Sequence, residues 1–155
     1  MAVSLTVQEG ISLMRQYCNY QERCHQDVRT KGLKLGFRGD DLEEIISTMI
    51  TEKLLDEERY ARALARGKFR NNEWGKIKIK QALKLHAVPD YCIKKAMLEI
   101  DPEEYTQVVK KLAENKSKLL SNEKDRFKKK KKIADYLLQK GFEYEIITQT
   151  LGEED

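Results

Sequence analysis

The sequence predicts an all-α protein, an elongated tandem array of three three-helix modules with about nine helices. Three observations predict this fold. Only two prolines, Pro89 and Pro102, occur among the 155 residues, so long helices are permitted almost everywhere. Charged residues make up 36% of the chain and apolar residues 40%, a balance typical of helical proteins with large solvated faces. Finally, one apolar spacing recurs three times along the chain, which indicates internal repeats.

The repeated spacing has steps of four, five, five and four residues, and Gly32 is its one member that is not apolar. Its three occurrences are Val28, Gly32, Phe37, Leu42, Ile46; Ile79, Leu83, Val88, Ile93, Met97; and Ile133, Leu137, Phe142, Ile147, Leu151. A step of four keeps two side chains on one helix face. The steps of five bracket a chain break at Gly36-Phe37, Ala87-Val88-Pro89 and Gly141-Phe142. Because glycine often ends a helix and proline is tolerated in the first turn of the next one, each occurrence predicts a helix, a tight turn and a second helix.

Each helical hairpin follows one further predicted helix. These three helices are predicted over Ile11 to Tyr20, Asp56 to Phe69, and Asp101 to Leu120. Asp56 and Asp101 are suitable N-cap residues, and Pro102 suits the first helical position. The segment Lys76 to Lys80 alternates like a strand, but it continues into a strongly helical run and is predicted to be helical. The predicted modules are residues 1–55, 56–100 and 101–155. A single globular bundle with accidental spacing is the alternative.

The sequence predicts neither a catalytic set nor a metal site. Its cysteines, Cys18, Cys24 and Cys92, form no CxxC pair, and its two histidines lie far apart. A zinc site needs about four ligands at recognisable spacing, and the chain also has no glycine-rich phosphate loop. We therefore expect no enzyme activity, no metal, no cofactor and three reduced thiols.

A cytoplasmic location is expected. No apolar run approaches the roughly 20 residues that span a bilayer. Met1 to Glu9 lacks the basic start and apolar middle of a signal peptide.

Positive charge is concentrated in the middle of the chain. The net charge is +4, but residues 56–100 hold 11 Lys and Arg against 6 Asp and Glu. At 100° per residue, four arginines fall within about 80° of arc on the predicted helix from Asp56. They are Arg59, Arg62, Arg66 and Arg70, and a predicted turn at Asn71-Asn72 separates them from Lys76, Lys78 and Lys80. Guanidinium groups repeated once per turn can meet a phosphate backbone, and N–H groups at the start of the next helix can add to an anion site. The alternative is an ordinary solvated face with Glu58 and Arg62 paired at i,i+4.

Two further features fit nucleic-acid contact. The run Lys128 to Lys132, with Lys128, Lys129, Lys131 and Lys132 as candidate binding residues, either attracts phosphates without sequence preference or is only a hydrated helix start. Trp74 and Phe69 can stack on the bases of a single strand, although an aromatic residue at a turn is more often a corner plug.

Three segments carry family-like motifs. The central one is Leu55-Asp56-Glu57-Glu58-Arg59-Tyr60-Ala61, followed by Gly75-Lys76 and by Ile79 and Leu83. The outer two are Arg23 to Phe37, and Lys140-Gly141-Phe142 with Tyr144 and Ile147. Together they resemble the RecX family of recombination regulatory proteins over nearly the whole chain. The departures from the family pattern are Glu57 for Asp, Tyr60 for Phe, Cys24 for Ser and Gly32 for Leu. Gly32 removes a buried aliphatic group, which predicts a first module that is loose or repacked around Leu33 and Leu35.

The resemblance implies three tandem three-helix modules that lodge in the groove of a RecA recombinase filament on DNA. Such a protein hinders filament growth, ATP hydrolysis and strand exchange, and it also binds single- and double-stranded DNA without sequence preference. The expected partners are therefore the RecA filament and DNA, with no membrane, and the chain is expected to be a monomer. Two other classes fit the composition: a helical nucleic-acid-binding protein unrelated to recombination, and a protein-docking scaffold whose charges only keep it in solution.

Overall fold

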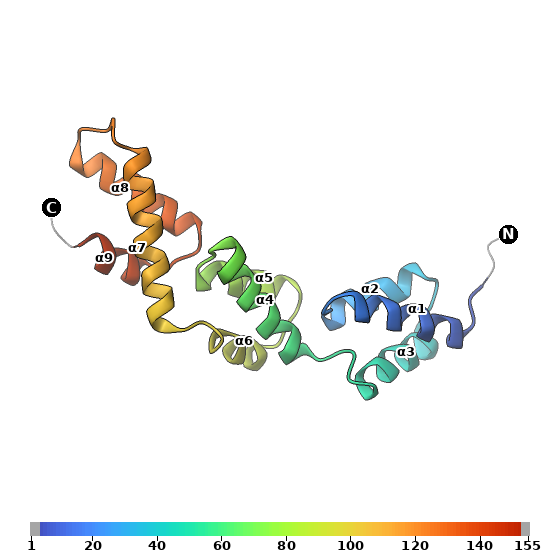
Figure 1. The fold of residues 1–155 in the computed structure, drawn as a ribbon. Helices are drawn as coiled ribbons and strands as arrows, with labels where there is room; N and C mark the ends of the chain where they lie inside the picture. Colours follow the sequence, from blue (N-terminus) through green and yellow to red (C-terminus); the bar gives the residue numbers. More distant parts are fainter. Residues whose placement is uncertain (1–3, 153–155) are drawn as a thin grey trace. The chain divides into compact units, whose positions relative to one another are not determined.

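The computed structural model describes residues 4–152, which fold into nine helices and no strand (Figure 1). In chain order these are α1 (Val7–Tyr20), α2 (His25–Lys34), α3 (Gly39–Thr51), α4 (Glu57–Asn72), α5 (Lys76–Leu85), α6 (Asp90–Met97), α7 (Pro102–Leu119), α8 (Arg126–Gln139) and α9 (Tyr144–Leu151). The strand-like segment at the start of α5 is helical, as predicted. None of these nine helices is long and apolar enough to cross a membrane.

Two helix boundaries differ from the prediction. Helix α1 begins at Val7 instead of Ile11, because Thr6 and Glu9 form a capping box that satisfies the first backbone N–H groups. Helix α4 continues through Asn71-Asn72, and the chain turns at Glu73, whose φ is +56°.

The described chain divides into two compact units, and α4 and α5 each contribute to both. The first unit contains the residues up to Ala63 together with Leu83–Ala96. The second contains Leu64–Ala82 together with the residues from Met97 onward. This division does not decide the three module boundaries, which remain a prediction.

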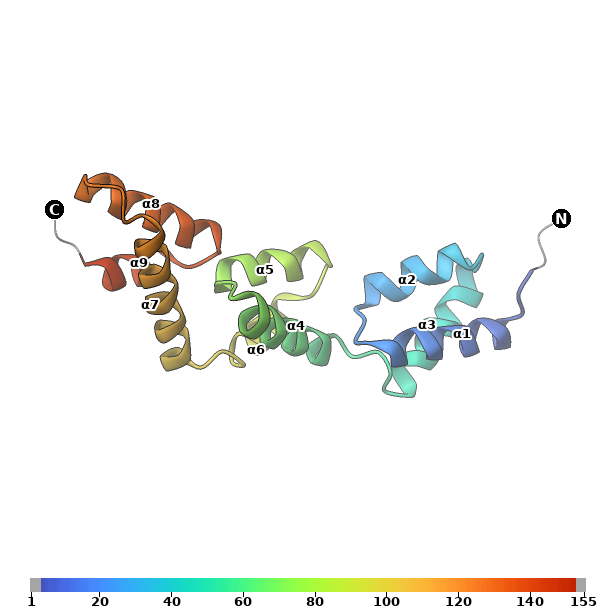
Figure 2. The ribbon, with the colours of Figure 1, turned by 45° about the horizontal axis from the view of Figure 1, so that its top comes forward.

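The core of the first unit lies where α1, α2 and α3 pack together (Figure 2). Gly32 of α2 does not loosen it. A Cβ at Gly32 would overlap Cδ1 of Leu42 and lie 3.7 Å from Cε of Met14, so side chains of α3 and α1 already fill this space. Leu33 is 38% exposed, and Leu35 alone of the two packs against the core. The expected repacking around Leu33 is therefore wrong, because the neighbouring helices supply the missing volume.

The core of the second unit lies between α7, α8 and α9, and α4 adds a ring to it. Tyr105 of α7 stands between two other rings, with centroids 5.8 Å from Phe69 and 5.3 Å from Phe142. All three rings are buried. Phe69 is thus a core residue and offers no surface for a base.

All three predicted turns end the preceding helix in the same way. A backbone N–H donates to the carbonyl five residues earlier, in the pairs Phe37 to Gly32, Val88 to Leu83 and Phe142 to Leu137, at 3.0, 3.1 and 3.1 Å. This is the long hydrogen bond of a Schellman motif, which needs a left-handed residue before the donor. That residue has φ +97° at Gly36, +57° at Ala87 and +98° at Gly141. The first step of five in the sequence repeat therefore marks the two ends of this hydrogen-bonded turn.

Candidate nucleic-acid interface

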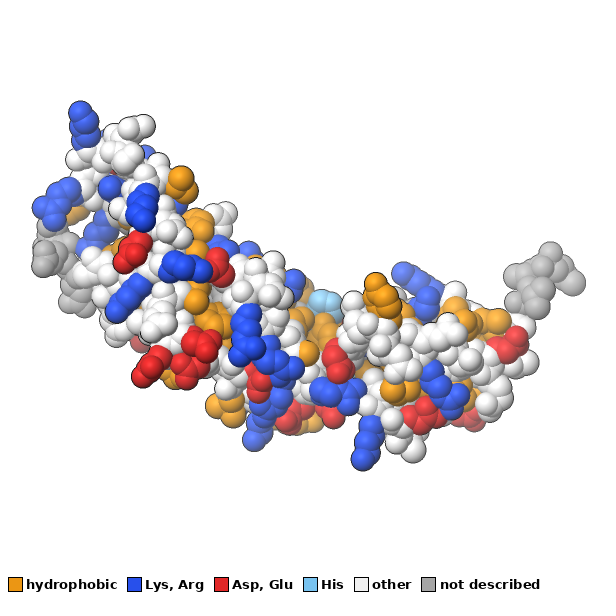
Figure 3. Space-filling model, in the orientation of Figure 1, with side chains coloured by type: hydrophobic (Ala, Val, Ile, Leu, Met, Phe, Trp, Pro, Cys, Tyr) orange, Lys and Arg blue, Asp and Glu red, His pale blue; other side chains and the backbone are white. Residues whose placement is uncertain are grey.

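Three of the four arginines predicted to meet phosphate are held by carboxylates. The ion pairs are Arg59–Glu22 at 2.7 Å, Arg62–Glu58 at 3.0 Å and Arg66–Glu99 at 2.5 Å. The i,i+4 pair of Glu58 and Arg62 was expected, whereas the other two carboxylates are distant in sequence. Arg70, at the end of α4, is exposed. Such pairing lowers the positive charge that α4 offers to a phosphate, and acidic and basic side chains indeed lie side by side on the face seen in Figure 3.

Three lysines near the start of α5 lie over aromatic rings instead. Their Nζ atoms are 4.8 Å (Lys68) and 4.6 Å (Lys78) from the centre of the Trp74 ring, and 4.9 Å (Lys76) from the centre of the Tyr105 ring. We call Lys68, Trp74, Lys76, Lys78 and Tyr105 the aromatic-lysine cluster. A ring attracts an ammonium group through its quadrupole but does not neutralise its charge. No ion pair within residues 4–152 involves these lysines, so the cluster keeps three positive charges.

The backbone N–H groups at the start of α5 are already occupied. Gly75 N donates to the carbonyl of Lys140 at 2.8 Å, and Ile77 N donates to the carbonyl of Gly141 at 3.0 Å. Lys76 N donates to the hydroxyl of Tyr105 at 2.9 Å. The expectation that these groups add to an anion site is therefore wrong, because the turn between α8 and α9 takes up two of them and α7 takes the third.

Two glycines make this close approach possible. A Cβ at Gly75 would overlap the carbonyl of Gly141, and a Cβ at Gly141 would overlap the Cβ of Lys78. The backbone of the α4–α5 turn thus rests directly on the backbone of the α8–α9 turn. Sequence reasoning used both glycines as turn residues and motif members, but it gave no sign that they meet.

Tyr105 is a residue of this site that sequence reasoning missed. It is buried at 4% exposure, its hydroxyl donates to a carboxylate oxygen of Glu143, and it accepts the Lys76 N–H. Burial, and after it the hydrogen bond to Glu143, raise the pKa of Tyr105. Its sequence signal is only an aromatic residue in the first turn of a predicted helix, which does not distinguish it from other core residues.

The remaining predicted lysines differ in their surroundings. Lys80 and Lys128 are exposed. Lys131 pairs with Asp135 at 3.3 Å, and Lys132 pairs with Glu123 at 3.0 Å. Lys129 is half-buried on the side of α8 that carries Ile133. The lysine run is therefore not one uniform charged surface.

The three cysteines are buried free thiols. Over residues 4–152, no group of His, Cys, Asp and Glu is arranged to hold a metal ion.

Sequence comparison identifies relatives of the chain. Profiles of the RecX second and third three-helix domains match residues 56–97 and 103–151, together more than half of the chain. A regulatory protein RecX of Prosthecochloris aestuarii is 28% identical over 137 residues, which cover 88% of this chain and 87% of the relative. One of Clostridium perfringens is 30% identical over 124 residues, which cover 79% of this chain and 58% of the relative. The chain thus spans less than two thirds of the Clostridium protein.

Solved structures give the same result. The crystal structure of RecX from Lactobacillus salivarius matches with a TM-score of 0.86 at 26% identity and 94% coverage of each chain. A crystal structure of another regulatory protein RecX, 22% identical, resembles the fold with a TM-score of 0.80 and covers 96% of this chain and 74% of its own. These matches confirm the predicted all-α tandem array of three-helix modules. By its motifs, its fold and its relatives, the chain belongs to the RecX family of regulatory proteins.

Proposed function

We propose that this chain is a non-enzymatic regulator that binds the RecA recombinase filament on DNA. In this proposal it hinders filament growth, ATP hydrolysis and strand exchange, and so modulates recombination and DNA repair. Membership in a family of regulatory proteins supports the regulatory role. The proposal includes modules at residues 1–55, 56–100 and 101–155, a cytoplasmic monomer, and binding to single- and double-stranded DNA without sequence preference.

The aromatic-lysine cluster is the observation that supports binding to DNA. Its lysines are ordered by rings and not by carboxylates, so their charge remains available to phosphate oxygens. Contacts of this kind fix the position of a protein on DNA but read no sequence. The proposed surface also keeps the other predicted residues: Arg59, Arg62, Arg66, Arg70, Lys80, Lys128, Lys129, Lys131 and Lys132.

Neutralising the cluster should weaken binding to DNA. We expect the triple variant Lys68→Gln, Lys76→Gln, Lys78→Gln to bind a labelled oligonucleotide about tenfold more weakly or worse, and to show a shallower salt dependence, by about 2 in the logarithmic slope. The measurement is fluorescence anisotropy at several salt concentrations. Trp74 is the one tryptophan of the sequence, so its emission should also change when DNA draws the lysines from the ring of the wild-type protein.

The matched control removes the same charge elsewhere. Lys110, Lys118 and Lys124 are exposed on α7 and in the loop after it, and their replacement by Gln should leave the affinity nearly unchanged. Equal losses in both triple variants would show that net charge alone attracts DNA, and no loss in either would remove the cluster from the proposed surface.

The arginines of α4 need a separate variant. We expect the quadruple change of Arg59, Arg62, Arg66 and Arg70 to Gln to reduce binding to DNA or to the filament, while helicity by circular dichroism persists. Glutamine is preferred to glutamate because a new negative charge beside Glu22, Glu58 or Glu99 would itself destabilise the fold. If this variant inhibited the ATPase of the RecA filament as strongly as the wild type does, the four arginines would be excluded from the binding surface.

The filament assay tests the regulatory role. Added at well below one copy per RecA subunit, the protein should slow the DNA-dependent ATPase of a preformed filament. No effect at equimolar amounts would contradict the proposal. Binding to DNA without any effect on RecA would favour a nucleic-acid-binding protein outside recombination, and the absence of both would favour a docking scaffold.

A further inference from the structure

Helix α8 presents two different faces within its lysine run. Arg126, Lys129, Lys130 and Ile133 follow the spacing i, i+3, i+4, i+7, which places them on one face. These four residues line a pocket, whereas Lys128 lies outside its lining. The positive charge of the run is thus divided between a pocket and open solvent.

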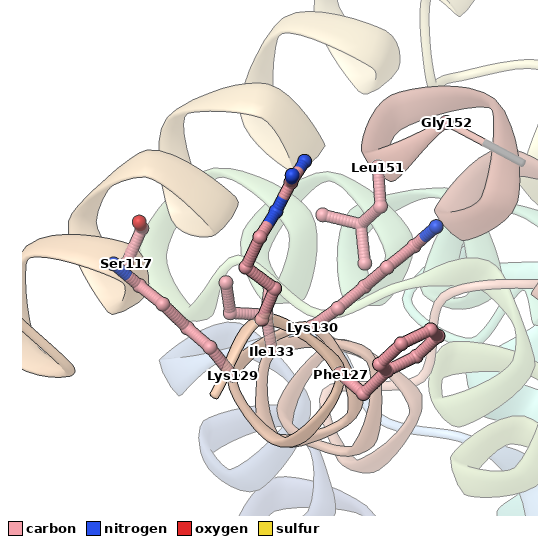
Figure 4. A pocket seen from close by; sticks show the side chains of 8 residues that line it. Ser117, Phe127, Lys129, Lys130, Ile133, Leu151 and Gly152 are labelled. Carbon is pink, nitrogen blue, oxygen red and sulfur yellow. The ribbon is translucent and has the colours of Figure 1, made fainter. Parts of the chain in front are cut away.

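The pocket has an apolar floor. It has a volume of about 670 Å³ and is formed by α8, by Ser117 of α7 and by the end of α9 (Figure 4). This size lies within the range of about 300–1,000 Å³ that is usual for ligand sites. Ile133 is buried at its base, Leu151 is half-buried, and the ring of Phe127 is 67% exposed. An exposed ring beside aliphatic side chains is a surface that an apolar partner group can cover.

The pocket also has a positively charged rim. Three cations line it, and none of the described residues in its lining is acidic. In Figure 4, Lys129 extends toward Ser117 and Lys130 extends toward Gly152 at the end of α9, so the two side chains diverge. Lys129 is only half-buried, which leaves its side chain partly accessible to a ligand. An occupant must therefore combine a bulky apolar group with negative charges on more than one side.

We propose that this pocket docks an acidic peptide segment of a protein partner, with one bulky apolar side chain flanked by Asp or Glu. The apolar side chain would cover Ile133, Leu151 and Phe127, and the carboxylates would pair with the rim. A single-stranded nucleic acid fits less well. It could stack one base on Phe127, but its charged phosphates would not cover the apolar side chains of Ile133 and Leu151. The proposal goes beyond binding to DNA, and it requires neither RecA nor DNA.

A labelled peptide tests the proposal on the full chain. The probe is a short peptide with a central Phe flanked by Glu and Asp, and the readout is fluorescence anisotropy. We expect binding that becomes about tenfold weaker when the Phe of the peptide is changed to Ser. We expect a similar loss with Phe127→Ala, and with the double variant Arg126→Gln, Lys129→Gln. The matched control, Lys110→Gln with Lys124→Gln, removes the same charge from exposed positions outside the pocket and should bind the peptide as the wild type does.

Several outcomes would overturn the proposal. Equal losses in the two double variants would reduce the interaction to general charge attraction. An oligo(dT) that binds more tightly than the peptide, and that is weakened by Phe127→Ala, would assign the pocket to single-stranded nucleic acid. Peptide binding that appears only after deletion of residues 153–155, whose sequence is Glu-Glu-Asp, would assign the pocket to the chain itself. Because this assay contains no RecA, its result does not depend on the outcome of the ATPase experiment.

Discussion

At the scale of single residues, Gly75 and Gly141 let two turns come into backbone contact. A Cβ at Gly75 would overlap the backbone of Gly141, and a Cβ at Gly141 would overlap the Cβ of Lys78 in α5. Gly67, in the preceding helix α4, has no atom within 4 Å of the place where its Cβ would lie. Gly75 therefore has no room for a side chain, whereas Gly67 has room for one. Because the two glycines are close in sequence, alanine substitutions at Gly67 and Gly75 form a matched comparison.

We expect Gly75→Ala to lower the free energy of unfolding by more than about 3 kcal/mol, because the overlap involves backbone atoms that cannot rotate away. Gly67→Ala should instead raise it by about 0.5–1 kcal/mol, because alanine favours the helix. Urea unfolding followed by circular dichroism measures both. A mild effect of Gly75→Ala would show that the two turns separate easily.

At the scale of elements, the three turns share one hydrogen-bond pattern but not one residue type. Two have glycine at the left-handed position, whereas the turn between α5 and α6 has Ala87, at φ +57°. A residue with a Cβ is disfavoured there. The turn between α5 and α6 is therefore the strained one of the three.

Ala87→Gly should raise the free energy of unfolding by about 1 kcal/mol, since glycine relieves this strain. The reciprocal change, Gly36→Ala, should lower it by about 1–2 kcal/mol. No atom lies within 4 Å of a Cβ at Gly36. The loss of stability in Gly36→Ala would therefore come from the backbone conformation alone and not from a steric overlap. Thermal or urea unfolding distinguishes the two signs, and destabilisation by Ala87→Gly would contradict the assignment of strain.

The helices and turns were largely predictable because their signals are local. The step of five residues, the capping aspartates and the glycines at the turns are each read within one turn of chain, and the structure has helices at all nine predicted places. The start of α1 was missed because Thr6 and Glu9 lie before the first apolar residue that the periodicity used. The packing of Leu42 and Met14 into the space at Gly32 depends on three helices at once, which no local pattern contains.

At the scale of the whole molecule, the buried thiols link stability to pH. Burial raises the pKa of Cys18, Cys24 and Cys92, and it raises the pKa of Cys24 to about 12. Cys24 also caps α2, since its sulfur accepts the N–H of Asp27 at 3.4 Å. Folding therefore favours the protonated thiol, whereas an unfolded chain releases the proton near the ordinary thiol pKa of about 8.5.

Stability should consequently fall as the pH rises from the ordinary thiol pKa toward about 12. Cys24→Ser keeps an oxygen that can cap the helix but does not titrate in this range. We expect the wild type to lose about 1–2 kcal/mol more than this variant between about pH 8 and about pH 10, as measured by urea unfolding at each pH. Parallel curves for the two proteins would show that Cys24 does not contribute.

The candidate site was less predictable than the fold. Sequence alone placed cations on one side of α4, but it could not show that Glu22 and Glu99 pair with two of them, because those carboxylates lie far away in the chain. It also could not show that Trp74 and Tyr105 hold the lysines around α5. Charge and periodicity indicate where positive residues are concentrated, whereas the tertiary contacts determine which of them remain unpaired.

The contact of Gly75 with Gly141 also constrains how such repeats can be recombined. In a chimaera whose residues 101–155 come from a relative, the residue at the position of Gly141 would have to be glycine. This holds even if the other residues that contact the rest of the chain match well. A shorter neighbouring side chain would not make room at either position, because a Cβ at Gly75 would meet the backbone of Gly141 and Phe142, and a Cβ at Gly141 would meet the backbone of Lys78 as well as its Cβ. Both glycines are therefore needed together, and a chimaera that lacks either one should fold poorly where the two turns meet.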